Sequence, residues 1–517
     1  MTAPPTPAPF TFAELTPTAF LDRSGHAFAP RTAIVDGELR FTYGEFLDRS
    51  HRLAGALHAR GIEPGDRVAA LATNSHVMIE LHHGVPYAGA VLVPLNTRLS
   101  VGELVHIVQH SGAKLLVATR ELAEQARAVA DETGIDLIEE GEDYDGVVAG
   151  GEPRVVPVRD ERGLIAINYT SGTTGRPKGV MYHHRGAYLQ AVAMAFHTRL
   201  TPEAHYLWTL PMFHCDGWCF PWAVTAAGAT HVCLRAIDPE EIWRLIRTEG
   251  VTHYCAAPTV LTMIANTPAA DSGPLPERRV TVATGGAPPS PTLLSRMDEL
   301  GMAVTHLYGL TETYGPVVIN DWHPEWSDLP GEEQARLGAR QGVGNIIAQK
   351  LRVLGENGVD VPNDGETMGE LAVRGNDVML GYYRDPEATA EVDADGWFRT
   401  GDLGVLHPDG YVEIRDRSKD VIISGGENIA SVEVERVLDS HPAVIESAVV
   451  GEPHERWGEV PVAYVAVREE VEAEVLIEHV RVHLARFKAP KRIYFGELPK
   501  TSTGKIQKTE LRGAKPM

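Results

Sequence analysis

Apolar residues recur along the chain in two different periods, and the alternation of the two predicts the architecture. Short runs that are almost entirely apolar, such as residues 67–72 and 90–94, predict buried strands. Longer stretches with apolar residues three or four positions apart, such as 46–60 and 77–89, predict amphipathic helices. The alternation continues, with strands predicted at 163–168, 231–234, 280–284 and 304–308 and helices at 185–197, 239–249 and 291–300. This order is typical of layered α/β structure with parallel sheets.

After residue 350 the pattern changes to short strands separated by turn residues, predicted at 351–354, 370–374 and 410–415. A charged segment follows at 416–420. Beyond it we predict helices at 430–440 and 474–486 and strands at 444–450 and 462–467.

These patterns predict an α/β protein in several parts. We expect a large N-terminal domain of layered α/β subdomains plus a β-rich subdomain, and a small α+β domain at the C-terminus. The predicted boundaries are a disordered tail at 1–14, the large domain at 15–415, a boundary segment at 416–420 and the small domain at 421–517. The length of 517 residues agrees with this division, because one core stops growing near roughly 250–300 residues.

The net charge of −23 argues against nucleic-acid binding, which requires a basic face. Positive charge is nevertheless concentrated in residues 486–517, which contain nine Lys and Arg against two Glu. A local basic segment in an acidic protein favours the binding of anionic small molecules. The alternative is a solvated basic tail.

The segment 1–9 is rich in Pro and Thr and lacks Lys and Arg, unlike a secretory signal. No uncharged apolar run reaches the ~20 residues that span a bilayer. The four cysteines lie between Cys215 and Cys255, which argues against a disulfide framework in so long a chain. Cys215 and Cys219 lack a second Cys/His pair at zinc spacing. We therefore expect reduced cysteines and a cytoplasmic location.

The clearest chemical signal is a loop rich in Gly and Thr that follows the strand at 163–168. Residues 170–179 read TSGTTGRPKG, and the backbone and hydroxyl donors of such a loop can surround anionic oxygens. Lys178 adds a positive charge. A Walker loop requires a Gly-Lys pair followed by Ser or Thr, whereas here Pro177 precedes Lys178 and Gly179 follows it. An ordinary flexible turn is the remaining alternative.

The loop resembles the phosphate loop of the adenylate-forming superfamily, which includes acyl-coenzyme A synthetases, peptide-synthetase adenylation domains and luciferases. Further segments are similar to the motifs of that family and follow in the same order, at 308–313, 397–404, 416–420, 424–429 and 498–506. The resemblance covers essentially residues 15–510. It implies attack of a carboxylate on the α-phosphate of ATP, release of diphosphate, and transfer of the acyl group to coenzyme A (CoA). These reactants are anionic, so the enzyme mainly positions groups and neutralises charge.

The resemblance also implies roles for individual residues. Glu312, with Thr173, would bind Mg²⁺, for which hard oxygen ligands are suited. Asp402 would bind the ribose hydroxyls, and Tyr308 would stack on adenine. The expected catalytic residues are Lys505, Glu312 and His214. The expected ATP-binding residues are Thr170, Ser171, Gly172, Thr173, Thr174, Gly175, Lys178, Gly286, Ala287, Pro288, His306, Tyr308, Gly309, Thr311, Asp402, Arg417 and Lys419. For each there is a structural alternative, such as a turn residue, a core tyrosine or a surface lysine.

The resemblance further implies an acyl pocket, a CoA tunnel and a moving domain. The C-terminal domain would be mobile: its rotation about Lys419, within a hinge at 416–420, would let a thiol replace Lys505 at the site. A homodimer is possible. The tunnel would include Gly425, Gly426 and Glu427, and the acyl pocket would include His214, Trp218, Gly285 and Thr313.

The nature of the acid depends on the motif PMFHCDGWC at residues 211–219. Amino-acid-activating domains place an Asp directly after the Phe, to pair with the substrate ammonium. Here His214 takes that position, and we expect Asp216 to point elsewhere, which favours an uncharged acid. The segment 323–343 resembles the branch that handles short- and medium-chain acids, including butyrate, benzoate-type and methylmercaptopropionate ligases. The alternatives are an enzyme that transfers the acyl group to a carrier protein or oxidises it, and a non-catalytic relic.

The role implied for Lys505 gives a first prediction. Lys505→Ala should abolish acyl-adenylate formation but largely spare the transfer from a pre-made acyl-adenylate to CoA. Loss of one preorganised charge of this kind costs on the order of 10²–10³ in rate. The measurement compares diphosphate exchange with single-turnover thioester formation. Equal losses in both half-reactions would contradict the assignment.

Overall fold

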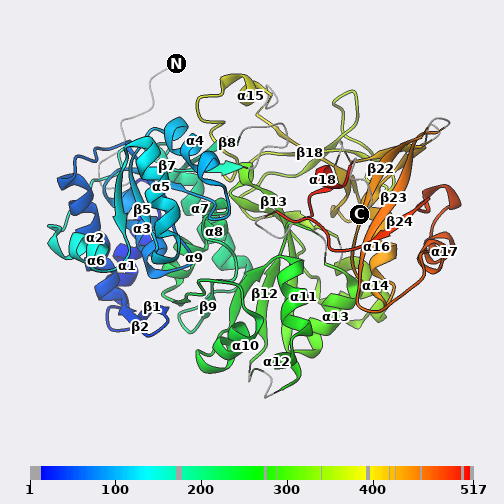
Figure 1. Ribbon diagram of the computed structural model, residues 1–517, viewed down its shortest axis with the longest axis horizontal. Coiled ribbons are helices and arrows are strands. Elements are labelled where there is room, and N and C mark those ends of the chain that lie inside the picture. Colours follow the sequence, from blue (N-terminus) through cyan, green and yellow to red (C-terminus); the bar gives the residue numbers. More distant parts are fainter. Residues whose placement is uncertain are drawn as a thin grey trace. The chain divides into compact units, whose positions relative to one another are not determined.

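The computed structural model describes residues 13–170, 177–272, 276, 278–287, 289–338, 340–391, 396–417, 420–424, 427–454, 457–501 and 506–512. The chain forms two compact units, and both are discontinuous in sequence (Figure 1). Unit 1 comprises Met1–Tyr254, Leu310–Gly315 and Gly375–Glu391; unit 2 comprises Cys255–Gly309, Pro316–Arg374 and Val392–Met517.

Unit 1 contains a six-stranded sheet in the order β6-β5-β3-β4-β7-β8. All neighbouring strands are parallel except β7 and β8, which are antiparallel. Side chains of α4 and α5 pack with these strands into one apolar core. The elements are β3 (Arg67–Leu71), β4 (Val91–Pro94), β5 (Ala113–Ala118), β6 (Asp136–Glu139), β7 (Leu164–Thr170), β8 (Lys178–His183), α4 (Val101–Ser111) and α5 (Ala123–Thr133).

Unit 1 also contains the strands β11-β9-β10-β1-β2 in that order, all parallel except the β1–β2 pair. The helix α2 starts at a capping box, in which the Thr42 hydroxyl and the Glu45 carboxylate accept each other's backbone N–H. The elements are β1 (Thr32–Asp36), β2 (Leu39–Thr42), β9 (His205–Leu207), β10 (Thr230–Val232), β11 (His253–Ala256), α2 (Tyr43–Ala59), α3 (His76–Tyr87), α7 (His184–His197), α8 (Cys215–Trp218), α9 (Phe220–Ala227) and α10 (Pro239–Thr248).

Unit 2 begins with β12 and β13, which run parallel from the Val280–Met302 pair to the Thr284–His306 pair. It then forms the predicted β-rich subdomain, a four-stranded antiparallel sheet in the order β16-β17-β18-β19. The elements are α11 (Pro258–Asn266), β12 (Val280–Thr284), α13 (Pro291–Glu299), β13 (Met302–Leu310), β14 (Gly315–Ile319), α14 (Gly331–Gly338), β15 (Val343–Gly344), β16 (Arg352–Leu354), β17 (Gly369–Val373), β18 (Phe398–Leu406) and β19 (Val412–Arg417).

The C-terminal part has the predicted α+β character. Its core lies between the sheet and the helices α16 and α17. The strands β22 and β23 form an antiparallel hairpin, and β23, α17 and β24 form a parallel crossover. The elements are β20 (Ile422–Ser424), β21 (Glu427–Ile429), α16 (Ser431–Asp439), β22 (Val444–His454), β23 (Gly458–Val467), α17 (Ala473–His483) and β24 (Ile493–Phe495).

The predicted α/β fold class, with its β-rich and C-terminal parts, is therefore confirmed. The differences lie at element ends and in strands outside the predicted ranges, such as β8 and β18. The hairpin β22–β23 is longer than predicted, because its outer residues, apart from Val460, are polar, Gly or Pro and carry little apolar signal. The strand β19 continues through Asp416 and Arg417, which pair with Leu403 and Asp402. The hinge and the domain boundaries stay predictions, and residues 1–12 of the predicted tail lie outside the described residues. Within the described ranges, no helix is long and apolar enough to cross a membrane.

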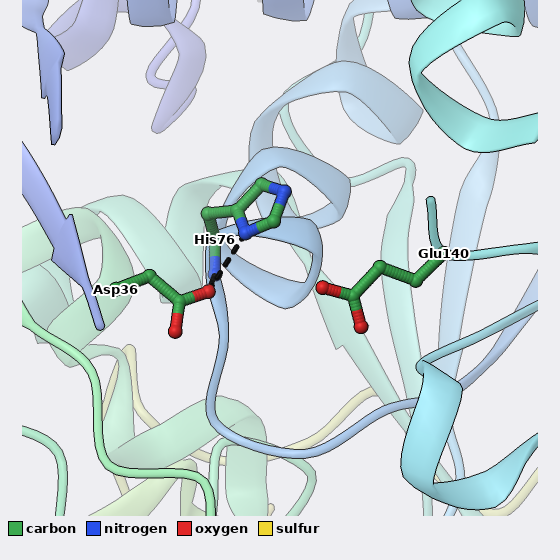
Figure 2. A group of neighbouring side chains, drawn as sticks. All are labelled: Asp36, His76 and Glu140. Carbon is green, nitrogen blue, oxygen red and sulfur yellow. Dashed lines mark hydrogen bonds and ion pairs between the residues drawn. The ribbon is translucent and has the colours of Figure 1, made fainter. Parts of the chain in front are cut away.

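A buried group of charged side chains joins distant segments of unit 1. Asp36 ends β1, His76 begins α3 and Glu140 follows β6, and the three side chains face one another (Figure 2). The His76 ring nitrogen Nδ1 lies 2.7 Å from Asp36 Oδ2. The donor types would suit a metal ion, but Arg235 Nη2 lies 2.6 Å from Asp36 Oδ2 and 2.7 Å from Glu140 Oε1. Arg235 therefore supplies the positive charge of this group.

The arginine contacts lower the pKa values of the Asp36 and Glu140 carboxyl groups. Burial raises the pKa of Glu140, but hydrogen bonds from Arg235 and Arg120 outweigh burial and hold this pKa at about 2. The pKa of Asp36 is also lowered. Burial alone would raise this pKa, but hydrogen bonds from His76 and Arg235 outweigh burial. A lowered carboxyl pKa stabilises the fold above the pKa of the unfolded chain, about 4.3 for Glu. For Glu140, that contribution is lost as the pH falls toward 2.

Arg235→Met should lower the free energy of unfolding by about 3–5 kcal/mol, because two buried carboxylates lose their cation. Urea unfolding at pH 7 measures this loss. Arg244→Met is the matched control, because Arg244 pairs with Glu241 on the exposed surface of α10, where a pair contributes about 0.5 kcal/mol. Between pH 4.5 and 2, stability should fall less steeply in Arg235→Met than in the wild type. Equal destabilisation by the two substitutions would contradict this account.

Candidate active site

The two ends of the predicted phosphate loop are held together by the β7–β8 hairpin. Thr170 pairs with Lys178, and Tyr169 pairs with Gly179, across the two strands. A Cβ on Gly179 would lie 2.9 Å from Ile167 Cγ2 and 3.1 Å from Tyr169 Cζ, so glycine permits this close packing. The loop residues Ser171, Gly172, Thr173, Thr174 and Gly175 lie outside the described residues.

The predicted magnesium ligand Glu312 lies in a short 3₁₀ turn, η2 (Thr311–Thr313). Its Oε1 accepts a hydrogen bond of 2.7 Å from the Tyr382 hydroxyl, and the Thr311 carbonyl accepts one of 2.6 Å from the Tyr182 hydroxyl. The Lys178 ammonium lies 4.9 Å from the centroid of the Tyr382 ring. Burial, and secondarily the Glu312 carboxylate, raise the pKa of Tyr382, so its hydroxyl keeps its proton and remains a donor.

The acid-side motif lies beside the same turn. Cys215 Sγ is 3.7 Å from His214 Nε2 and 3.5 Å from Thr311 Oγ1. Burial raises the pKa of Cys215 to about 12, so it stays a neutral thiol. Trp218 is buried, and a Cβ on Gly315 would lie 2.6 Å from its indole Cδ1. Thr313 is also buried, and its hydroxyl donates to the Gly315 carbonyl at 2.7 Å.

Asp216 lies within a run of five residues in the left-handed region, from Cys215 to Cys219, with φ between 47° and 63°. Such a conformation costs roughly 1–2 kcal/mol for each non-glycine residue. Asp216 is fully buried, and it is held by Asn168, which donates to Asp216 Oδ2 at 2.8 Å and accepts from its N–H at 3.1 Å. His82 Nε2 lies 3.4 Å from Asp216 Oδ1. Asp216 thus stabilises the turn: Asn168 occupies its Oδ2, while its Oδ1 faces His82 and accepts no hydrogen bond from the described residues.

Unit 2 brings together a second group of predicted residues. The Tyr308 hydroxyl, on β13, donates to Asp402 Oδ2, on β18, at 2.5 Å. Residue 306 on β13 pairs with Thr284, so His306 lies beside the end of β12, where Gly285, Gly286 and Ala287 follow. Gly286 has φ +88°, and a Cβ there would meet open space.

Other predicted residues lie outside the described residues: Pro288, Lys419, Gly425, Gly426 and Lys505. Arg417 ends β19 opposite Asp402, and Glu427 begins β21.

Three residues of the site were missed by the sequence analysis: Tyr382, Tyr182 and Asn168. Tyr382 lies 70 positions from its partner Glu312, and Asn168 lies 48 positions from Asp216. The sequence contains no local pattern that joins such pairs. Only the position of Asn168, two residues before the phosphate loop, gives a weak signal.

The family model described as "AMP-binding enzyme" matches residues 21–383, and the model described as "AMP-binding enzyme C-terminal domain" matches 433–505. The chain belongs to the family of AMP-binding enzymes. It is similar to the peroxisomal acetate/butyrate–CoA ligase AAE7 of Arabidopsis thaliana, at 44% identity over 98% of the chain and 95% of that protein. It is also 44% identical to 4-hydroxybutyrate–CoA ligase 2 of Metallosphaera sedula, over 97% of the chain and 94% of that protein.

Among solved structures, ATP-bound MatB from Rhodopseudomonas palustris superimposes with a TM-score of 0.85 at 29% identity, covering 97% of the chain and 98% of that structure. The predicted adenylate-forming superfamily and the predicted class of enzyme, an acyl-CoA synthetase and hence an acid–thiol ligase, are confirmed.

The position of Asp216 generates a prediction. Asp216→Ala should lower the free energy of unfolding by about 2–4 kcal/mol, because Asn168 and His82 would be left buried without their partner. The same variant should raise KM for the acid, because the left-handed turn loses its anchor. Asp216→Asn should retain most of both properties, because an amide oxygen can accept from Asn168 and an amide N–H can donate to His82. Thermal unfolding and acid-dependent kinetics measure the two effects. A loss of acid affinity in Asp216→Asn as large as that in Asp216→Ala would instead indicate a charge that pairs with the substrate.

Proposed function

We propose that this enzyme converts ATP, CoA and a short- or medium-chain uncharged carboxylic acid into acyl-CoA, AMP and diphosphate through an acyl-adenylate. The observation that carries the proposal is the contact between two predicted motifs. Cys215 contacts His214 of the acid-side motif and Thr311 of the motif that contains Glu312. An acid at the first motif would therefore lie close to the cation and phosphates at the second.

The burial of Asp216 supports an uncharged acid. An ammonium group in the acyl pocket would need a carboxylate partner, because a buried unpaired charge costs several kcal/mol. Asp216 is occupied by Asn168 and faces His82. The relatives' names support a small acid, since they include acetate, butyrate and 4-hydroxybutyrate.

The donor set around Glu312 fits Mg²⁺. The carboxylate is a hard oxygen ligand, and its described partner at Oε1 is a neutral hydroxyl rather than a protein cation. Glu312 with Thr173 would hold the ion, which would supply positive charge to offset that of the phosphates.

The remaining residues position the anionic reactants. Thr170, Lys178 and the loop between them would bind the phosphates, Thr311 would support them, and His214, Trp218, Gly285 and Thr313 would surround the acid. Tyr308 and Asp402 would bind adenine and ribose together, and their hydrogen bond of 2.5 Å supports a joint role.

The C-terminal residues would act in turn. We propose that Lys505 neutralises charge during adenylation and that rotation at Lys419, between domains 15–415 and 421–517, then opens the CoA tunnel beside Gly425, Gly426 and Glu427. A cytoplasmic location and a homodimer complete the proposal. The four cysteines, all within the described residues, are buried thiols, which supports a reducing compartment.

Kinetics with matched four-carbon acids would test the acid specificity. Butyrate, 4-hydroxybutyrate and 4-aminobutyrate have the same length and differ at one end. We expect kcat/KM for butyrate to exceed that for 4-aminobutyrate by about 100-fold or more, because burying an unpaired ammonium costs about 3 kcal/mol or more. The measurement is CoA-dependent release of AMP and diphosphate. Comparable rates with 4-aminobutyrate would contradict the uncharged pocket, and steady AMP release without CoA would indicate a different acceptor.

A further inference from the structure

Tyr382 contacts the two charged side chains to which the proposed function assigns the cation and the phosphates. Its hydroxyl donates to Glu312 Oε1 at 2.7 Å. The face of its ring lies 4.9 Å from the Lys178 ammonium. We propose that Tyr382 is a positioning residue for the magnesium–nucleotide complex: its hydroxyl orients the Glu312 carboxylate and its ring orients Lys178. This inference rests on the proposed function.

The backbone around Tyr382 is hydrogen-bonded both to the strand of Lys178 and to the backbone of Glu312. Leu380 N–H donates to the Met181 carbonyl at 3.0 Å, Met181 N–H donates to the Gly381 carbonyl at 3.0 Å, and Tyr382 pairs with Val180. The segment therefore lies alongside β8, the strand that begins at Lys178, and is hydrogen-bonded to it. Met379 N–H donates to the Glu312 carbonyl at 2.8 Å. One short segment is thus bonded to the strand of the lysine and to the backbone of the glutamate.

The position of the tyrosine is fixed from its other side by α15 (Pro386–Ala390). Tyr382 N–H donates to Thr389 Oγ1 at 2.9 Å, and this hydroxyl donates to the Asp385 carbonyl at 2.8 Å. Gly381 has φ +137°, and a Cβ there would lie 2.6 Å from Thr389 Cγ2. A side chain at position 381 would therefore both strain the backbone and displace the threonine that holds Tyr382.

A phenol suits this role because it engages each charge without cancelling it. The hydroxyl occupies Oε1 of Glu312 and leaves the carboxylate its full negative charge for a cation at Oε2. The ring face attracts the Lys178 ammonium but leaves its N–H donors for phosphate oxygens. In the described part of the chain, Lys178 and Glu312 meet through Tyr382 and form no direct ion pair. A direct pair would neutralise both groups.

Tyr382→Phe keeps the ring and removes the hydroxyl. A hydrogen bond to a charged group contributes about 1.5 kcal/mol or more, which corresponds to about a tenfold change in an equilibrium constant. We therefore expect the half-saturating Mg²⁺ concentration for adenylation to rise about tenfold. The dissociation constant of Mn²⁺ in the presence of a non-hydrolysable ATP analogue, measured by electron paramagnetic resonance, should rise to the same extent. Tyr382→Leu should in addition weaken nucleotide binding measured without metal, because Lys178 loses the ring.

Tyr383→Phe is the matched control, because its hydroxyl lies 3.5 Å from the Ser111 carbonyl and touches neither charged group. It should leave both constants unchanged. Thermal unfolding of Tyr382→Phe and Tyr383→Phe should resemble that of the wild type, which shows that both fold.

Glu312→Gln separates the failure of this inference from the failure of the proposed function. If Glu312→Gln binds Mn²⁺ with the nucleotide and adenylates like the wild type, the assignment of Glu312 is wrong. If Glu312→Gln loses both properties while Tyr382→Phe behaves like Tyr383→Phe, the site stands and the role of Tyr382 is overturned.

Discussion

The antiparallel pairing of β7 with β8 is the constraint on which the described part of the unit 1 site depends. It closes one edge of an otherwise parallel sheet and sets Thr170 opposite Lys178. Asn168 pairs with Val180, and Tyr182 pairs with Ala166, so Asn168 and Tyr182 lie on the same face of the hairpin, because alternate side chains of a strand share a face. Asn168 on β7 holds the left-handed turn through Asp216, and Tyr182 on β8 holds the turn of Glu312 through Thr311. One hairpin thereby fixes the phosphate loop ends, the acid-side motif and the cation ligand together.

Much of this framework could be predicted from the sequence, because the signals are local. The strand β4 is apolar throughout, and the helix α10 carries its apolar residues on one face, so period alone identifies them. The ends of helices and strands were harder to predict, because this local periodicity is missing there. The hairpin β22–β23 continues into polar residues that carry no periodicity, and its register is set by pairing with the partner strand. The phosphate loop could be predicted from the sequence because the residues that would donate to phosphate are contiguous.

The side-chain pairs of the site could not be predicted, because each joins segments that the sequence separates. Asp216 shows the difficulty best. It lies in the acid-side motif at a place where a carboxylate could meet a substrate, and nothing nearby in sequence indicates that Asn168 occupies it. The reason is conformational: a left-handed run from Cys215 to Cys219 is strained, and it persists only where a buried group holds it. The residue that looks available for chemistry is therefore the one that the turn requires.

The partners of the carboxylates distinguish structural from functional acids in this acidic protein. Asp36 and Glu140 share the guanidinium of Arg235, and Glu413 accepts from Arg436. Those pairs neutralise charge, which suits groups whose task is to join segments. Glu312 instead accepts from a tyrosine hydroxyl. A guanidinium at that position would compete with a metal ion for the same oxygens, whereas a neutral donor orients the carboxylate and preserves its charge, as outer-shell partners of metal ligands do. The choice of phenol over guanidinium thus supports the proposal that Glu312 binds a cation.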